Sequence, residues 1–81
     1  MLKAQLHIHC KDDPQDKLKY SAEEVIDKAA ELNFNVLSFT LHNKLFYPKE
    51  IVEYAKKKDI LLIPGIELNI EGRDVLIYGL E

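Results

Sequence analysis

The stretch Leu6-His7-Ile8-His9, followed at once by Cys10-Lys11-Asp12-Asp13-Pro14, organises the chain. Side chains alternate faces along an extended strand, so the two histidines point to one side while Leu6 and Ile8 point to the other, toward apolar packing. A strand that ends in His-x-His and runs into a charged, proline-containing loop places two nitrogen ligands at its C-terminal end. Ligand sites collect at that edge of a parallel sheet, so we expect later elements to bring further polar groups there.

Hydrophobic periodicity and capping residues predict two helices between three strands, followed by a hairpin. Ser21 is the expected N-cap, Glu24 completes its capping box, and Asn33 suits the left-handed position after that helix. Pro48 suits the first position of the second helix, and the lysines at 56–58 complement its C-terminal dipole. The expected strands are residues 3–9, 35–40, 60–63, 66–70 and 75–78, with Glu71-Gly72-Arg73-Asp74 between the last two.

This order predicts an α/β fold, β-α-β-α-β plus a β-hairpin. Right-handed crossovers would make the first three strands parallel and place both helices on one face of the sheet. The C-terminal ends of those strands then share one edge, which would carry His7 and His9, His42 and Glu67. All three histidines of the chain are therefore expected at this edge.

Length and composition restrict the class of protein. The 81 residues allow one domain with a modest core, and 47% apolar with 31% charged residues is typical of a soluble globular protein. A net charge of −3 without a basic block argues against a nucleic-acid surface. The longest apolar run, residues 60–63, is too short for a membrane span, and no secretory signal pattern opens the chain. The single cysteine, Cys10, cannot form an internal disulfide, so we expect a cytoplasmic location.

The residues at the C-terminal edge suggest metal-assisted hydrolysis. Two imidazoles and a carboxylate form a ligand set for zinc, manganese or iron. A bound divalent ion lowers the pKa of water from about 15.7 to about 7 and neutralises charge that develops on a phosphoryl oxygen. Asp12 and Asp13 are candidates for hydrogen-bonding the ligands or completing a neighbouring metal site, and Lys44 is a candidate contact for an anionic substrate.

Each of these residues also has a simpler interpretation. The two strand-end histidines can be solvated, His42 can be an ordinary loop residue, and Glu67 can be a turn residue of the hairpin. Cys10 suits a small buried thiol, although its sulfur beside His9 is also a candidate zinc ligand. The shared position of all three histidines favours the metal interpretation.

Three segments resemble the motifs of the PHP (polymerase and histidinol phosphatase) domain family. Leu6-His7-Ile8-His9 matches the first motif, and Phe39-Thr40-Leu41-His42-Asn43 is similar to the second, which is usually threonine-aspartate-histidine. Ile63-Pro64-Gly65-Ile66-Glu67-Leu68 is similar to the third. The motifs occur in the family's order and span essentially the whole chain, which therefore resembles the N-terminal part of a PHP domain.

The resemblance implies the first part of a distorted, TIM-like (βα)7 barrel whose metal cluster hydrolyses phosphate esters. His7 and His9 would bind one metal, Glu67 would bridge two, and His42 would bind a third or line the substrate pocket. Glu67 and His42 are then the candidate catalytic residues. Zinc or manganese is the expected metal, with iron or magnesium as alternatives, and the substrate would be a phosphorylated small molecule or another phosphoester.

The sequence departs from the family pattern at two positions and in length. Leu41 replaces the aspartate of the second motif, which removes a carboxylate that could orient its neighbour. Asp74 stands where related sequences often have histidine, so it joins Asp13 as a weaker ligand candidate. A closed barrel needs about 200 to 250 residues.

Residues 1–81 are therefore expected to be a single, partial domain whose sheet does not close on its own. An oligomeric partner or a further C-terminal portion would cover its open edge. Two alternatives to an enzyme segment are a non-catalytic metal- or ligand-binding module and a fragment that associates with itself.

Overall fold

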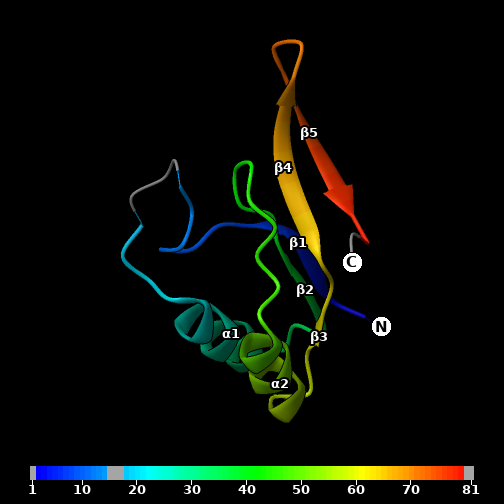
Figure 1. Cartoon of the computed structure of the whole chain (residues 1–81). Helices are drawn as coiled ribbons and strands as arrows, with labels where there is room; N and C mark the ends of the chain where they lie inside the picture. The colour runs from blue at the N-terminus through cyan, green and yellow to red at the C-terminus, as the bar shows by residue number, and fades with distance from the viewer. Residues whose placement is uncertain (1, 15–17, 80–81) are drawn as a thin grey trace.

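Three parallel strands and two helices form the main body of the protein, and an antiparallel hairpin extends from it (Figure 1). The computed structural model describes residues 2–14 and 18–79, so the ends of the predicted 1–81 domain and residues 15–17 of the polar loop lie outside the described residues. The element order confirms the predicted β-α-β-α-β unit plus hairpin, and both helices lie on one side of the parallel sheet (Figure 1). The elements are β1 (Ala4–Ile8), α1 (Ala22–Glu31), β2 (Val36–Phe39), α2 (Lys49–Lys57), β3 (Leu61–Leu62), β4 (Gly65–Ile70) and β5 (Arg73–Tyr78).

Both helices end where local hydrogen bonding satisfies their terminal backbone groups. The capping box of Ser21 and Glu24 begins α1, as predicted. Asn33 has a φ of 65° and donates to Ala30, while the next amide donates to Ala29, which together form a Schellman motif. Asp59 ends α2 in the same way with a φ of 59°, and this second motif was not predicted.

Pro48 does not occupy the first helical position of α2. It is the N-cap, with an extended ψ of 140°, and the helix begins one residue later at Lys49. Its carbonyl accepts from the amides of Ile51 and Val52, so the proline still begins the helix although its side chain provides no cap.

One parallel register joins β2 to both β3 and β4. Val36 pairs with Leu61, Leu37 with Leu62 and, beyond the bend, His42 with Glu67, so partners are always 25 residues apart. The predicted strand at residues 60–63 is shorter in the structure because Pro64 has no amide hydrogen for the ladder. After this break the chain again runs parallel to the segment that continues β2, so that Glu67 pairs with His42.

The hairpin is tighter than predicted. Glu71 and Gly72 alone form its turn, with φ values of 50° and 80°, and β5 already begins at Arg73. Two consecutive left-handed residues match the right-handed twist of the flanking strands, as in a type I′ turn. Asp74 is therefore a strand residue opposite Asn69, not part of a four-residue connection.

The hydrophobic core lies between the parallel sheet and the helices, but one side of β1 remains open. Phe39, Leu37 and Ile26 are fully buried, whereas Leu6 is 38% exposed, so its predicted apolar packing is wrong. β1 is the edge strand of the parallel sheet, and the Tyr78 hydroxyl of β5 donates to the Leu6 carbonyl. Neither helix in the described part of the chain is long and apolar enough to cross a membrane.

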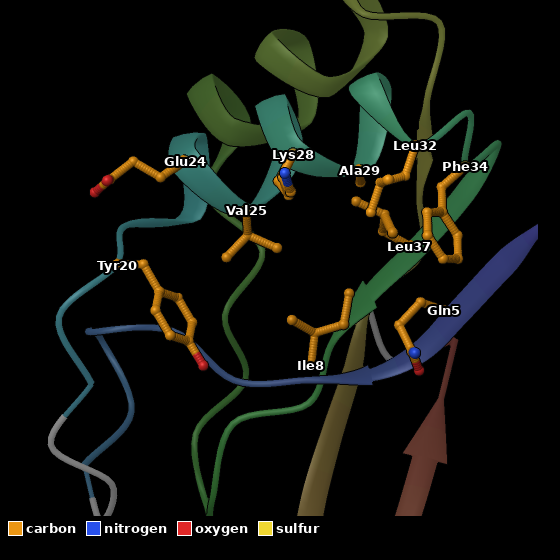
Figure 2. A pocket seen from close by; sticks show the side chains of 10 residues that line it. All are labelled: Gln5, Ile8, Tyr20, Glu24, Val25, Lys28, Ala29, Leu32, Phe34 and Leu37. Carbon is orange, nitrogen blue, oxygen red and sulfur yellow. The ribbon is translucent and has the colours of Figure 1, made fainter.

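An apolar groove of about 490 Å³ lies between α1 and β1 (Figure 2). Ile8 of β1 and Val25 of α1 face each other across it, and Tyr20 points into one end (Figure 2). The complete lining is Gln5, Ile8, Tyr20, Glu24, Val25, Lys28, Ala29, Leu32, Phe34 and Leu37.

The close approach of β4 to β2 predicts a large effect of Gly65→Ala. A Cβ at this position would lie 2.5 Å from Ser38 Oγ and 3.0 Å from Thr40 Cγ2, both on fully buried side chains. We expect a loss of about 1–3 kcal/mol in the free energy of unfolding, measured by urea denaturation. Ser38→Ala removes the nearer atom, so the Ser38→Ala/Gly65→Ala double variant should be less destabilised than the sum of the single variants. Simple additivity would contradict the proposed clash.

A second prediction concerns the contact between the two helices. Tyr54 of α2 donates a hydrogen bond of 2.6 Å to Asp27 of α1, and this bond holds the pKa of Asp27 below its ordinary value, with help from Lys58. The resulting stabilisation is present above the ordinary carboxyl pKa and is lost as pH falls through the lowered pKa. Tyr54→Phe should therefore lower the Tm at pH 7 but not in strong acid.

Tyr47→Phe is the matched control, because the Tyr47 hydroxyl donates to the main-chain carbonyl of Leu62, which does not titrate over this range. Its effect on Tm should be the same at both pH values. An effect of Tyr54→Phe that is also independent of pH would contradict the assignment.

Candidate metal centre

Four chain segments bring ionisable side chains to the C-terminal edge of the parallel strands. His7 lies in β1 and His9 just after it, His42 follows β2, and Glu67 lies in β4. The fourth segment is the loop after β1, where the Asp13 amide donates to the Cys10 carbonyl and the chain turns back toward the histidines. The structure thus brings together all four principal ligand candidates, along with one of the two weaker ones.

Glu67 Oε1 is the point on which three imidazoles converge. The Nε2 atoms of His7 and His9 both lie 2.9 Å from it, and Nε2 of His42 lies 3.6 Å from it. His7 and His9 reach the same oxygen, as the sequence predicted, although the register of β1 against β2 is irregular between Gln5 and Ile8. His42 reaches it because it is the register partner of Glu67.

Asp13 contacts the opposite nitrogens of two of these rings. Its Oδ2 lies 2.5 Å from Nδ1 of His9, and both carboxylate oxygens lie 3.2 Å from Nδ1 of His42. The His42 main-chain amide also donates to Oδ2 at 3.0 Å. The rings of His9 and His42 stack with centroids 4.6 Å apart and an interplanar angle of 24°. Both present Nδ1 to Asp13 and Nε2 to Glu67.

The site is buried on the carboxylate side and open at one histidine. The Asp13 and Glu67 side chains are 0% and 6% exposed, whereas that of His7 is 49% exposed. Burial alone would raise the pKa of Glu67, but the hydrogen bond with His7 and the charges of His42, His7 and His9 outweigh burial and hold that pKa below its ordinary value. Glu67 is consequently ionised at neutral pH.

The donor atoms fit a divalent cation. Two sets of three side chains, His7–His9–Glu67 and His9–Asp13–His42, each have ligand atoms within 4.8 Å of one another. Ligands at about 2.0–2.1 Å from a tetrahedral zinc ion lie about 3.3 Å apart, close to the 2.9–3.6 Å that separates Glu67 Oε1 from the three Nε2 atoms. Imidazole nitrogen with carboxylate oxygen suits zinc, manganese and iron.

Other candidate residues lie outside these two sets. Asp74 accepts a hydrogen bond from Asn69 on the hairpin, and Lys44 contacts the main-chain oxygen of Asp12 at 3.4 Å. Cys10 is fully buried, and burial raises the pKa of its thiol above the ordinary value, which disfavours the thiolate that zinc would need. The simple buried-thiol interpretation of Cys10 therefore fits the structure.

Sequence reasoning underestimated Asp13. From the sequence, Asp13 is only a weaker ligand candidate and has the same supporting role as Asp12, but only Asp13 is buried against His9 and His42. The turn from Cys10 to Asp13 separates the two carboxylates, and Pro14 directly after Asp13 was the one available sign that the chain changes direction there.

Comparison with known proteins assigns the sequence to a family. The family model described as PHP domain matches residues 5–78, from the second residue of β1 to the last residue of β5. No curated protein matches the chain.

The convergence on Glu67 predicts that a divalent cation stabilises the fold. Zinc at 100 times its Kd should add about 2.7 kcal/mol to the free energy of unfolding, equivalent to roughly 10–20 °C in Tm for a domain of this size. His9→Ala should remove most of this shift, because His9 belongs to both donor sets. Asp74→Ala is the control and should retain the shift. Equal zinc-induced shifts in His9→Ala and wild type, measured by thermal unfolding, would contradict the site.

Proposed function

Because the chain belongs to the PHP domain family, we propose that its histidine–carboxylate cluster binds a divalent metal ion and serves the hydrolysis of a phosphate ester. The observation that carries this proposal is the convergence of three Nε2 atoms on the buried Glu67 Oε1. Three nitrogen donors and an ionised oxygen, held by β1, β4 and the segments that follow β1 and β2, form a rigid site for a cation. Zinc or manganese is the metal we propose, with iron or magnesium as alternatives.

We assign a distinct role to each side chain of the cluster. His7, His9 and His42 would hold the metal through Nε2, and Glu67 would hold it through Oε1 or bridge to a second ion. A bound divalent metal would supply a water of lowered pKa and would neutralise charge on a phosphoryl oxygen. Glu67 and His42 lie nearest to the reacting groups in this proposal and are its catalytic residues.

The exposure of the site suggests how a substrate approaches. His7 is the half-exposed member, whereas His9, His42 and Glu67 are 16%, 21% and 6% exposed in their side chains. A phosphoester would therefore enter from the side of His7. The apolar groove between α1 and β1 is not this entrance, because the β1 histidines contact β4 and do not line the groove.

We also propose that the described elements form the first part of a TIM-like (βα)7 barrel. The three parallel strands leave β1 and β3 as edges among the described residues, and the groove beside β1 exposes apolar side chains. Further chain beyond Glu81 or an oligomeric partner would cover these open edges of the parallel sheet. Full catalytic activity would then require the edges to be covered. The partial-domain assignment of residues 1–81 and the cytoplasmic location stay predictions.

The second candidate function is a metal-binding module without catalysis. Leu41 favours it, because this residue replaces a family aspartate and is fully buried in the core, where it offers no polar group to a substrate. Binding and catalysis would share the same four ligands, so only turnover separates the two functions.

Hydrolysis of p-nitrophenyl phosphate with added manganese or zinc tests the catalytic proposal. We expect metal-dependent release of p-nitrophenol, and we expect Glu67→Gln to lower kcat/KM at least about 100-fold because it removes the anionic oxygen at the centre of the site. Asp74→Asn, on the hairpin, should leave kcat/KM unchanged. A protein that binds metal with no turnover would favour the binding module, and a fully active Glu67→Gln variant would exclude the proposed site.

A further inference from the structure

We propose that Tyr78 is a positioning residue of the metal centre. Its hydroxyl holds an irregular segment of β1, Leu6-His7, in the form that turns the His7 side chain toward Glu67. The part of this inference that concerns zinc affinity rests on the proposed function, whereas the orientation of His7 can be measured without metal.

The irregular segment of β1 is a β-bulge. Gln5 pairs with Leu37 and Ile8 pairs with Phe39, so the step from 5 to 8 along β1 matches the shorter step from 37 to 39 along β2. A bulge of this kind leaves the extra residue outside the ladder and reorients the side chains beside it. Leu6-His7 is the bulged segment, because it lies between the two paired positions.

The bulge decides which side of the sheet His7 faces. Gln5 and Ile8 both line the groove beside α1, although residues three apart in a regular strand face opposite sides (Figure 2). In a regular strand with Gln5 in this position, His7 would face the groove as well. It faces Glu67 instead, with Nε2 at 2.9 Å from Oε1. The contact between His7 and Glu67 therefore depends on the bulge.

Tyr78, the last residue of β5, contacts the bulge through its hydroxyl. This hydroxyl donates a hydrogen bond to the carbonyl of Leu6, which belongs to the peptide group that joins Leu6 to His7. Tyr78 pairs with Gly65 of β4, on the face of the hairpin that also carries Glu67. A Cβ on Gly65 would lie 3.1 Å from Tyr78 Cδ1, so the missing side chain leaves room for the ring beside β4.

Among the three histidines, His7 is the one that we expect to move when this hydrogen bond is lost. Its side chain is 49% exposed, whereas those of His9 and His42 are 16% and 21% exposed and both also contact Asp13. β1 is an edge strand of the parallel sheet, and the register of such a strand is weakly specified where neither face is fully buried. The bulge therefore needs a contact of its own to stay at Leu6-His7.

Tyr78→Phe tests this role because it removes the hydroxyl and keeps the ring beside Gly65. Tyr47→Phe is the matched control, since the Tyr47 hydroxyl also donates to a main-chain carbonyl, that of Leu62 in β3. Zinc affinity is measured by calorimetric titration at a temperature at which every variant is folded. Tyr78→Phe should lower it about 10-fold, the lower end of the range for a group that supports a metal ligand. Tyr47→Phe should leave it unchanged.

The same substitution in a His7→Ala background separates positioning of His7 from a general loss of stability. If Tyr78 acts through His7, Tyr78→Phe should change the zinc affinity of His7→Ala by less than about twofold. An equal loss of zinc affinity in both backgrounds would show that the hydroxyl acts on another part of the site and would overturn the proposal. An unchanged zinc affinity in Tyr78→Phe, even with a lower Tm, would also overturn it.

Nuclear Overhauser contacts in the metal-free protein provide a measurement that does not involve zinc. Wild type should show contacts between the Tyr78 ring and Leu6 Hα, and between the His7 ring and the methylene protons of Glu67. Tyr78→Phe should lose the contact between His7 and Glu67, and Tyr47→Phe should keep it.

The metal-free spectra also separate this proposal from the proposed function. A contact between His7 and Glu67 that persists in Tyr78→Phe would overturn the proposal. Absence of the contact between Tyr78 and Leu6 in wild type would overturn it without any variant. A chain that binds no zinc but loses the contact between His7 and Glu67 in Tyr78→Phe would support the positioning role and contradict only the metal function.

Discussion

The buried carboxylate of Glu67 is the constraint on which the rest of the structure depends. An ionised carboxylate removed from water is unfavourable by several kcal/mol unless opposite charge or hydrogen-bond donors compensate. Here the compensation comes from His7 and His9 at the end of β1 and from His42 after β2. The contacts that make burial of Glu67 tolerable are therefore the same contacts that create the site, and fold stability and cation binding are coupled.

The main chain fixes the position of Glu67 as firmly as the side chains do. The Glu67 amide donates to the Leu41 carbonyl, and the Glu67 carbonyl accepts from the Asn43 amide, so β4 continues the parallel register of β2 on both sides of His42. Gly65 makes this possible, because a side chain there would collide with Ser38 and Thr40. The Pro64-Gly65 break lets one segment leave the ladder and rejoin it at the correct residue.

Much of this arrangement could be predicted from the sequence. The strand-period placement of His7 and His9, the helix caps at Ser21 and Asn33, and the positions of His42 and Glu67 near strand ends all follow from local rules. What local rules do not give is tertiary register. The sequence treats Pro64-Gly65 as the end of a strand, whereas the structure resumes the same register after it, and nothing in the local pattern distinguishes these outcomes.

The features that the sequence did not predict correctly also depend on how the segments fold against one another. Leu6 has the pattern of a packed strand residue, but exposure depends on whether another element covers β1. Asp12 and Asp13 are chemically identical, and only the turn that reverses the chain selects Asp13 for contact with two imidazoles. The two-residue turn at Glu71-Gly72 could not be predicted because Glu71 adopts a positive φ, which glutamate rarely does.

The central claim is that ends of separate strands create one nitrogen- and oxygen-lined cation site. X-ray absorption spectroscopy of the zinc-loaded protein tests it most directly, because the spectrum reports the ligand atoms around the ion. We expect three imidazole nitrogens and a carboxylate oxygen at about 2.0–2.1 Å from the zinc ion, with no sulfur. A shell with sulfur at about 2.3 Å, or one without imidazole scattering, would contradict it.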